Sequence, residues 1–169
     1  YRNVITTEDE KGNPKEVGFL SYVDYIENEI EKYHLEMNPD FQRGHVWTED
    51  QQSKYIEFML KGGKTGRDFY FNWNQVTNEY VCVDGLQRTT ALQKFVHNEL
   101  KVFGQYFDEF EFPKRKIEYA TSKYGCYVYQ NNLKTKKEVL QWYVDMNAGG
   151  TPHTNEEIER VKKMIKEIE

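Results

Sequence analysis

The sequence lacks most of the signatures that would assign it to a common enzyme class. Its 2 cysteines, Cys82 and Cys126, lie far apart and match no disulfide framework or metal-ligand spacing. Its 4 histidines are scattered, and no two of them stand four residues apart as zinc ligands on a helix do. No phosphate-binding loop of the form G-x-x-x-x-G-K-[ST] is present, and no Ser-His-Asp or Cys-His arrangement is supported. We therefore expect no metal site.

An excess of positive charge is also missing. The formal net charge is -5 and the sequence pI is about 5.5, whereas a protein that binds DNA without specificity is usually basic. A DNA contact would have to be made by another protein, such as a partner nuclease, or be local. A local contact would use the basic run Lys114–Lys116 or Lys134 with Lys136 and Lys137, unless these lysines only face solvent. No signal-peptide pattern and no run of about 18 apolar residues occurs, so we expect no membrane span and a reducing, cytoplasmic location.

What the sequence does contain is a high content of aromatic side chains. Aromatic residues make up 15% of the 169 positions, and each can bury a large apolar area. A chain of this length typically forms one domain with a real core. We expect a polar N-terminal arm over residues 1–18 and a single domain over residues 19–169.

Hydrophobic spacing predicts a mixture of helices and short strands. Helical spacing starts at Phe19 and runs to about Ile30, and helices are also expected after the capping-box residues Thr48, Thr135 and Thr154 and after Gly85. Short β-rich runs predict strands near residues 34–37, 69–73, 80–83, 101–106 and 126–130. The fold class that follows is α+β, with short mixed strands and several packed helices.

The most informative stretch is Tyr80–Leu92, which reads YVCVDGLQRTTAL. It predicts a strand, a tight turn at Asp84–Gly85 and the start of a helix, whose first amides and dipole favour an anion. Arg88 adds a bidentate cation, and Thr89 and Thr90 add hydroxyl groups. The alternative is an ordinary strand-to-helix turn, in which Asp84 caps the helix and Arg88 pairs on the surface.

Two further stretches combine polar and turn-forming residues. Asn38–Trp47, which reads NPDFQRGHVW, places Arg43 before a capped helix; its alternative is a helix entry in which Phe41 or Trp47 is a hydrophobic staple. Met146–His153, which reads MNAGGTPH, could form a nest of backbone amides for a phosphate, or a plain helix end followed by proline.

The order of these three stretches resembles the DGQQR-motif family, the N-terminal domain of GmrSD-type restriction proteins, over roughly residues 19 to 165. The matching residues are Phe41–Arg43, Val46–Trp47, Val83–Leu92 and Asn147–Pro152. The resemblance implies a fold of the ParB and sulfiredoxin type. It also implies nucleoside triphosphate binding and hydrolysis linked to restriction. The chain departs from the family pattern at Leu86, where Gln is usual, and at His153, where an apolar residue is common.

The resemblance assigns roles to individual residues. Asp84 and Arg88 would be catalytic. The nucleotide-binding residues would be Gln42, Arg43, Gly85, Gln87, Arg88, Thr89, Thr90, Asn147, Gly149, Gly150 and Thr151. The ligand would be a nucleoside triphosphate, with or without Mg²⁺, in a setting of DNA restriction or phage-host defence. Two alternatives stay open: a DNA-binding or nuclease module, and a catalytically inactive regulator that binds another protein.

Overall fold

The computed structural model describes residues 16–42, 46–110, 125–148 and 155–168 of the chain. Its central sheet has four strands in the order β1-β4-β2-β3. Strand β2 pairs with β4 in parallel and with β3 in antiparallel register, and β1 pairs antiparallel with β4. The strands are β1 (Glu16–Val17), β2 (Asp68–Trp73), β3 (Tyr80–Asp84) and β4 (Cys126–Asn131). The α+β class is therefore confirmed.

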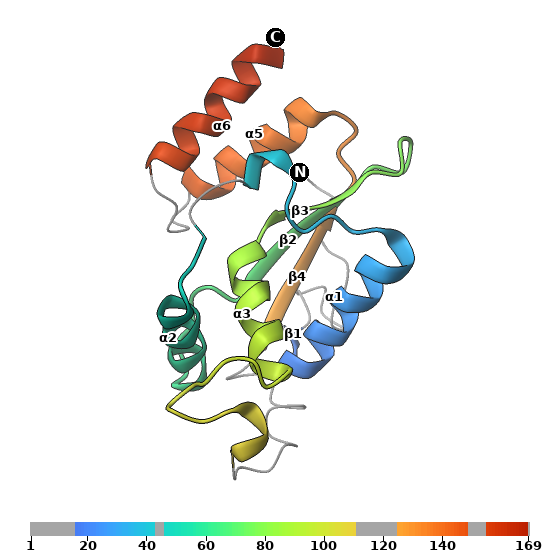
Figure 1. The fold of residues 1–169 in the computed structure, drawn as a ribbon. Coiled ribbons are helices and arrows are strands. Elements are labelled where there is room, and N and C mark those ends of the chain that lie inside the picture. The colour runs from blue at the N-terminus through green and yellow to red at the C-terminus, as the bar shows by residue number, and fades with distance from the viewer. Residues whose placement is uncertain (1–15, 43–45, 111–124, 149–154, 169) are drawn as a thin grey trace.

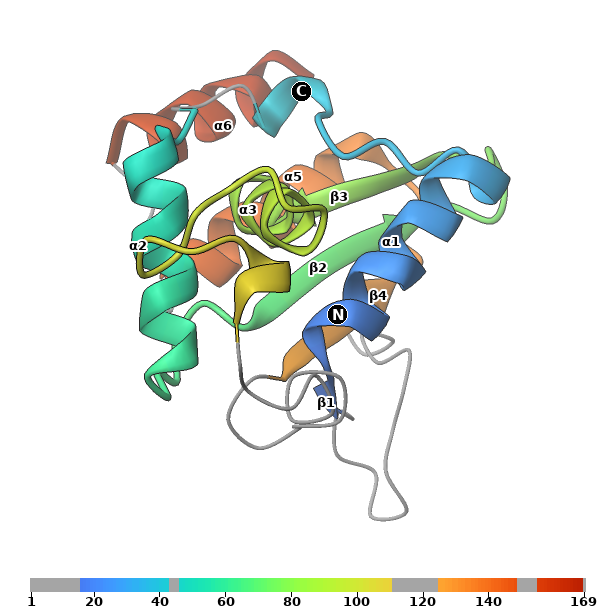
Figure 2. The same ribbon diagram turned by 60° about the horizontal axis from the view of Figure 1, so that its bottom comes forward.

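Helices cover both faces of this sheet (Figures 1 and 2). Helices α1 and α3 lie over one face with α2 beside them, and α5 covers the other face with α6 packed on it. The helices are α1 (Phe19–Tyr33), α2 (Glu49–Leu60), α3 (Leu86–Val96), α5 (Lys136–Ala148) and α6 (Asn155–Ile168). Two short 3-10 turns, η1 (Asp40–Gln42) and η2 (Phe107–Glu109), complete the described elements.

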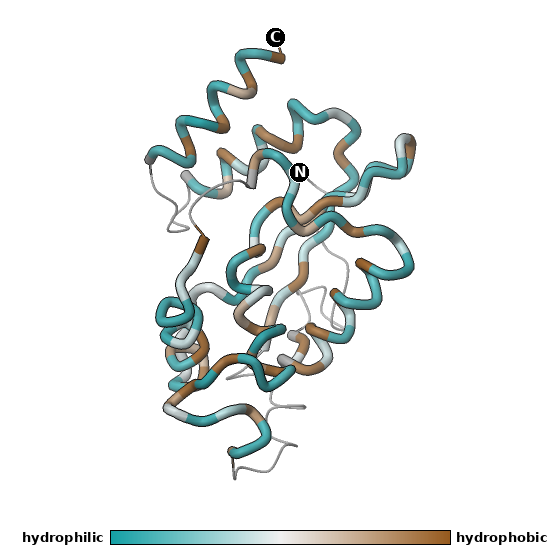
Figure 3. The backbone as a smooth tube through the Cα atoms, viewed as in Figure 1, coloured by the Kyte–Doolittle hydropathy of each residue, from teal (hydrophilic) through white to brown (hydrophobic). Residues whose placement is uncertain are grey.

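The alternation of side chains along the strands divides the apolar interior into two cores. In β2, Phe69 and Phe71 are fully buried in the core beneath α1 and α3, whereas Tyr70 packs against the core beneath α5. Successive side chains of a strand point to opposite faces of the sheet, so β2 contributes side chains to both cores. On the second face, α6 is mostly hydrophilic (Figure 3) and contributes a stripe at Ile158, Val161 and Ile165.

Most of the expected elements are present, and their ends are set by local chemistry. Helix α1 extends to Tyr33 and ends at His34, which adopts a left-handed φ of 57°. Thr48 and Gln51 form the expected reciprocal capping box at the start of α2. At the second expected box, Thr135 accepts from the Glu138 amide and its hydroxyl contacts the Glu138 carboxylate. The third box includes Thr154, which lies outside the described residues.

Two strand predictions need correction. The segment at 34–37 contributes only one bridge, between Glu36 and Val81. Residues 101–106 do not form a strand of the sheet; Val102 and Gln105 pair across a tight turn, because Phe103 and Gly104 both adopt positive φ. Of the predicted arm over residues 1–18, Glu16–Val17 is strand β1, and residues 1–15 lie outside the described part.

Candidate functional site

The turn between β3 and α3 is built on a glycine that no other residue can replace without strain. Gly85 is the N-cap of α3 with φ 133° and ψ 6°, and it makes no side-chain capping hydrogen bond. A Cβ atom at this position would lie 2.8 Å from Cδ1 of Phe69, which is closer than carbon atoms approach. The N-cap position is therefore held by Gly85 and not by Asp84, and Gly85 has no side chain that could accept from the amides of the first turn.

Asp84 and Arg88 form a buried ion pair under this turn. The Arg88 Nη2 atom lies 3.3 Å from Asp84 Oδ1, and their side chains are 12% and 4% exposed. Arg88 Nη1 also donates to the Asp68 carbonyl at 2.7 Å, and the guanidinium carbon lies 4.9 Å from the centre of the Phe69 ring. Arg88 thus ties the start of α3 to β2, and the alternative in which it pairs on the surface is wrong.

The electrostatics of the pair extend to a second carboxylate. Burial opposes the positive charge of Arg88, but the Asp84 carboxylate and neighbouring groups outweigh it, so the pKa of Arg88 is raised. Burial raises the pKa of the Asp68 carboxyl, while Arg88 and a hydrogen bond with Tyr129 oppose the rise and Asp84 adds to it. Tyr129 in turn stacks on Tyr70 with ring centres 5.0 Å apart.

Gln87 connects the turn to the segment around Trp47. Its side-chain oxygen accepts a hydrogen bond from the Trp47 backbone amide at 3.0 Å. The Trp47 ring packs on Tyr55 with ring centres 5.4 Å apart, and Tyr55 donates to the Gly66 carbonyl at 2.7 Å. Two of the three sequence stretches are therefore in direct contact, and Gln87 holds them together.

The two threonines of the motif use their hydroxyl groups inside the fold. Thr89 is 1% exposed and its Oγ1 lies 2.8 Å from the Tyr22 hydroxyl, between α3 and α1. Thr90 donates to the Leu86 carbonyl at 2.9 Å, within the same helix. The structure places Thr89 in the core and not on the surface of the turn, because position 89 faces α1 in the first turn of α3.

The Asn38–Trp47 stretch also contacts the helices on the opposite face of the sheet. Phe41 in η1 is 3% exposed and meets the Tyr143 ring edge-on at 6.0 Å between ring centres. Arg160 on α6 donates to the Phe41 carbonyl at 2.6 Å, and Lys136 on α5 pairs with Asp40. The Gln42 side chain and Arg43 lie outside the described residues.

The end of α5 reaches the same region. The pKa of Tyr143 is raised by burial and further by the carboxylates of Asp84 and Glu157, against the effect of Arg160. One turn later, Asn147 is 6% exposed and its amide donates to the Tyr143 carbonyl at 2.6 Å. Its Oδ1 atom has no hydrogen-bond partner among the residues that the structure describes. Gly149, Gly150 and Thr151 lie outside them.

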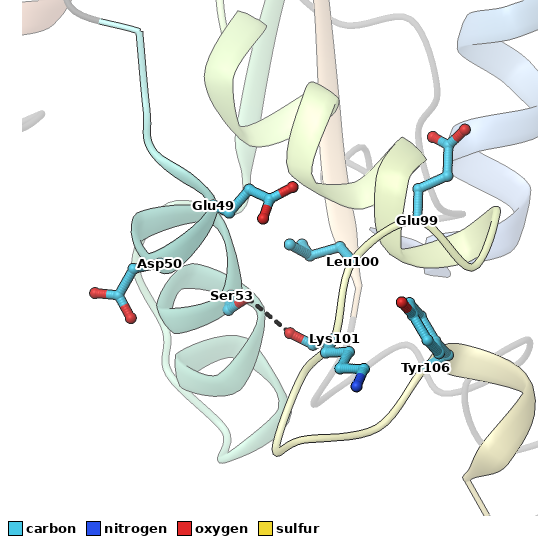
Figure 4. Close-up of a pocket in the computed structure, with 7 residues that line it drawn as sticks. All are labelled: Glu49, Asp50, Ser53, Glu99, Leu100, Lys101 and Tyr106. Atoms are coloured by element: carbon cyan, nitrogen blue, oxygen red, sulfur yellow. Dashed lines mark hydrogen bonds between the residues drawn. The ribbon is translucent and has the colours of Figure 1, made fainter.

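Other places in the described part of the chain offer less. No group of three or more His, Cys, Asp or Glu residues there could hold a metal ion. A pocket of about 390 Å³ between α2 and the segment after α3 (Figure 4) is lined by none of the motif residues. Its lining comprises Glu49, Asp50, Ser53, Glu99, Leu100, Lys101 and Tyr106. Within the described residues, no helix is long and apolar enough to cross a membrane.

Several residues of the site were not predicted as such. Tyr143, Asp68, Tyr22 and Arg160 were not assigned to the site from the sequence. Their roles depend on contacts between residues far apart in sequence: Asp68 and Arg88 are 20 positions apart, and Phe41 and Arg160 are 119 apart. No local pattern marks such contacts.

Comparison with known protein families accounts for the order of these segments. A family model described as the N-terminal domain of the GmrSD restriction endonuclease matches residues 23–164, which include all three motif stretches. No curated protein and no solved structure matches the chain significantly. The matched range covers most of the 169 residues, and the chain therefore belongs to the GmrSD restriction endonuclease N-terminal domain family, which links it to restriction.

Proposed function

We propose that this domain binds a nucleoside triphosphate through its phosphate groups, at the turn between β3 and α3. The observation that supports this most is that α3 starts at a glycine, Gly85, with the ion-paired Arg88 in the same first turn. Free backbone amides and the positive end of the helix dipole favour a bound anion at such a point. A positive charge fixed nearby strengthens the same preference.

The neighbouring segments would supply the remaining hydrogen-bond donors of the proposed phosphate site. Gln87 fixes Trp47 beside α3. Arg43 is four positions before Trp47 in the sequence. Asn147 lies at the end of α5, directly before the Ala148–Thr151 segment, and has a buried acceptor without a partner among the described residues. We infer that Arg43 and the amides of Gly149, Gly150 and Thr151 complete the phosphate site.

In this proposal Arg88 acts mainly by its fixed position. Two of its terminal nitrogens already contact Asp84 and the Asp68 carbonyl, although a guanidinium has five N–H donors in all. Asp84 keeps Arg88 charged and in place. Magnesium would arrive with the nucleotide, because this ion usually binds one or two carboxylates together with substrate phosphates.

Hydrolysis is the finer part of the proposal. Phosphoryl transfer depends chiefly on positioning and on stabilising charge that spreads over the phosphoryl oxygens. Arg88, Arg43 and the α3 amides would supply that charge. Asp84 would orient the attacking water or the metal ion, once the bound phosphates compete for its arginine.

The test is isothermal titration calorimetry of the chain with ATP, GTP, CTP and UTP, each with and without Mg²⁺. We expect at least one to bind, and Arg43→Gln to weaken binding by about 1.5–3 kcal/mol, as for a hydrogen bond to a charged group. Lys166→Gln, which removes an exposed charge on α6, is the matched control. Heat from none of the four nucleotides would refute the proposal, and phosphate release by the wild type would extend it to hydrolysis.

A further inference from the structure

Two large aromatic side chains are exposed on neighbouring segments of the fold, away from the β3–α3 turn. Phe58 on α2 and Phe103 in the turn after α3 are each 46% exposed. The two elements run side by side in both ribbon views (Figures 1 and 2). Ser53 Oγ donates to the Lys101 carbonyl at 2.7 Å, and Glu57 accepts from the Phe103 amide at 3.0 Å. These bonds hold the turn against α2.

Phe103 adopts a left-handed backbone conformation that is unfavourable for a bulky side chain. Its φ is 52° and that of Gly104 is 75°, and the amides and carbonyls of Val102 and Gln105 pair across them at 2.8 and 3.1 Å. A two-residue hairpin with two positive φ values normally takes Asn, Asp or Gly, so a bulky residue here is strained. The Phe103 ring remains 46% exposed, so burial of the ring does little to offset this strain. Backbone strain of this kind is often found at functional sites.

Phe58 is held in place by a glycine. A Cβ atom at Gly63 would collide with the Phe58 ring, so the ring packs directly on the Gly63 backbone. The Gly63 amide also donates to the Phe58 carbonyl at 2.9 Å. The ring is therefore oriented by the chain beneath it and still keeps nearly half of its surface exposed.

Three lysines lie on the same two segments as these rings. Lys61, the C-cap residue of α2, is three positions after Phe58, and its Nζ lies 5.4 Å from the centre of the Phe103 ring. Lys64 directly follows Gly63, and Lys101 Nζ lies 5.3 Å from the centre of the Tyr106 ring; Figure 4 shows Lys101 and Tyr106 on the segment beside α2. No salt bridge joins Lys61, Lys64 or Lys101 to a described residue, whereas Lys54 pairs with Asp50 and Lys94 with Glu49.

We propose that this surface, formed by Phe58, Lys61, Lys64, Lys101 and Phe103, binds single-stranded nucleic acid. Unstacked bases would stack on the two phenyl rings, and the three lysines would contact the backbone phosphates. Exposed aromatic rings together with lysines are the combination that binds single strands without sequence preference. The chain as a whole has a net charge of -5 and Glu57 also lies at this surface, so attraction of the phosphates would depend on these three lysines. The surface is separate from the proposed nucleotide site and does not depend on it.

The test is fluorescence anisotropy with a labelled 20-nucleotide oligo(dT) at low salt. Phe103→Asn is the decisive variant, because Asn suits the left-handed turn and should raise the melting temperature while it removes the ring. We expect this variant to bind about tenfold more weakly, since stacking on one aromatic ring contributes that much or more. Tyr33→Asn, which removes another exposed ring on α1, should bind like the wild type.

The lysines are tested by the salt dependence of binding. Lys61→Gln should reduce the slope of log K against log salt by about 0.7, the value for one phosphate contact with a single strand. Lys32→Gln, near the end of α1, is its control. No binding by the wild type, equal binding by Phe103→Asn, or equally effective competition by polyglutamate of the same charge would each overturn the proposal.

Discussion

The backbone amide of Trp47 lies 3.0 Å from the side-chain oxygen of Gln87, and this contact joins two motif segments that are 40 positions apart in sequence. Gln87 lies in the first turn of α3, immediately after the glycine turn. The side chain that the family resemblance assigns to nucleotide binding thus has a structural partner within the chain. It positions the segment that precedes α2.

Replacement of Gln87 by Leu removes this acceptor. We expect the free energy of unfolding to fall by about 1 kcal/mol, because the half-buried Trp47 amide loses its partner. Hydrogen exchange at the Trp47 amide, followed by NMR, should accelerate at the same time. Gln93→Leu, further along α3, is the matched control and should leave the exchange at Trp47 unchanged. Unaltered exchange in Gln87→Leu would contradict the proposed positioning role.

The elements with regular apolar spacing could be predicted from the sequence. Phe19–Tyr33 carries Tyr22, Val23 and Ile26 at helical intervals, and these three are fully buried. The Tyr80–Asp84 strand and the turn at Gly85 were also foreseen, because a β-rich run ends in Asp-Gly. Residues 101–106 were not, because the alternation there is interrupted by a left-handed turn at Phe103, a residue that gives no signal for one.

The site itself was predicted only in part. The sequence predicts an anion site at the start of α3, which stays a prediction, but it did not predict that Thr89 points into the core or that Arg88 turns toward β2. Both outcomes depend on which neighbour is nearest in space: Tyr22 for Thr89 and the Asp68 carbonyl for Arg88. Spacing along a helix gives the direction of a side chain but not its partner.

Gly85→Ala should be among the more damaging single substitutions in the chain. The new Cβ would meet Phe69 at 2.8 Å and would hold an unfavourable φ of 133°. Backbone strain and overpacking each cost about 1–3 kcal/mol, so the two together should lower the free energy of unfolding by about 2–6 kcal/mol. Gly62→Ala is the control: φ there is 92°, and nothing lies within 4 Å of the added atom.

The difference between these two variants isolates the contact with Phe69. Urea denaturation of both proteins measures it directly. If Gly85→Ala costs no more than Gly62→Ala, the close approach of Phe69 does not constrain the turn.

Arg88→Met should destabilise the chain by about 3–5 kcal/mol, the usual cost of removing one partner from a buried ion pair. The Asp84 carboxylate, which is 4% exposed, would lose the guanidinium 3.3 Å away. Arg88→Lys should recover only part of the loss, because an ammonium cannot contact both Asp84 and the Asp68 carbonyl in the planar geometry of arginine. Thermal denaturation of the two variants beside the wild type tests this order, and equal stability of all three would contradict it.

The tyrosine pKa values give a prediction for alkaline pH. The pKa of Tyr129 is raised from 10.0 to about 12 by burial and then by the charge and hydrogen bond of Asp68. Because the folded-state value is the higher one, the stability from this group is complete below pH 10.0 and is lost as the pH rises to about 12. Asp68→Asn should lower the pKa of Tyr129.

Tyr25 provides the internal control for that titration. Its pKa is also raised to about 12, but by burial and by groups that do not include Asp68. ¹³C NMR of ring-labelled tyrosine follows both residues in one sample. A pKa of Tyr129 that does not fall in Asp68→Asn, or an equal fall at Tyr25, would show that Asp68 does not act on Tyr129 as proposed.

The hydroxyl pair of Tyr22 and Thr89 lends itself to a double-mutant cycle. Both residues are at least 99% buried, and their oxygens are 2.8 Å apart. Tyr22→Phe or Thr89→Val alone should cost about 1–3 kcal/mol, because each leaves a buried hydroxyl without its partner. The double variant should cost less than the sum of the two, since it removes both polar groups together. Urea denaturation of the four proteins gives the coupling energy; strictly additive losses would mean that the two hydroxyls do not stabilise the contact between α1 and α3.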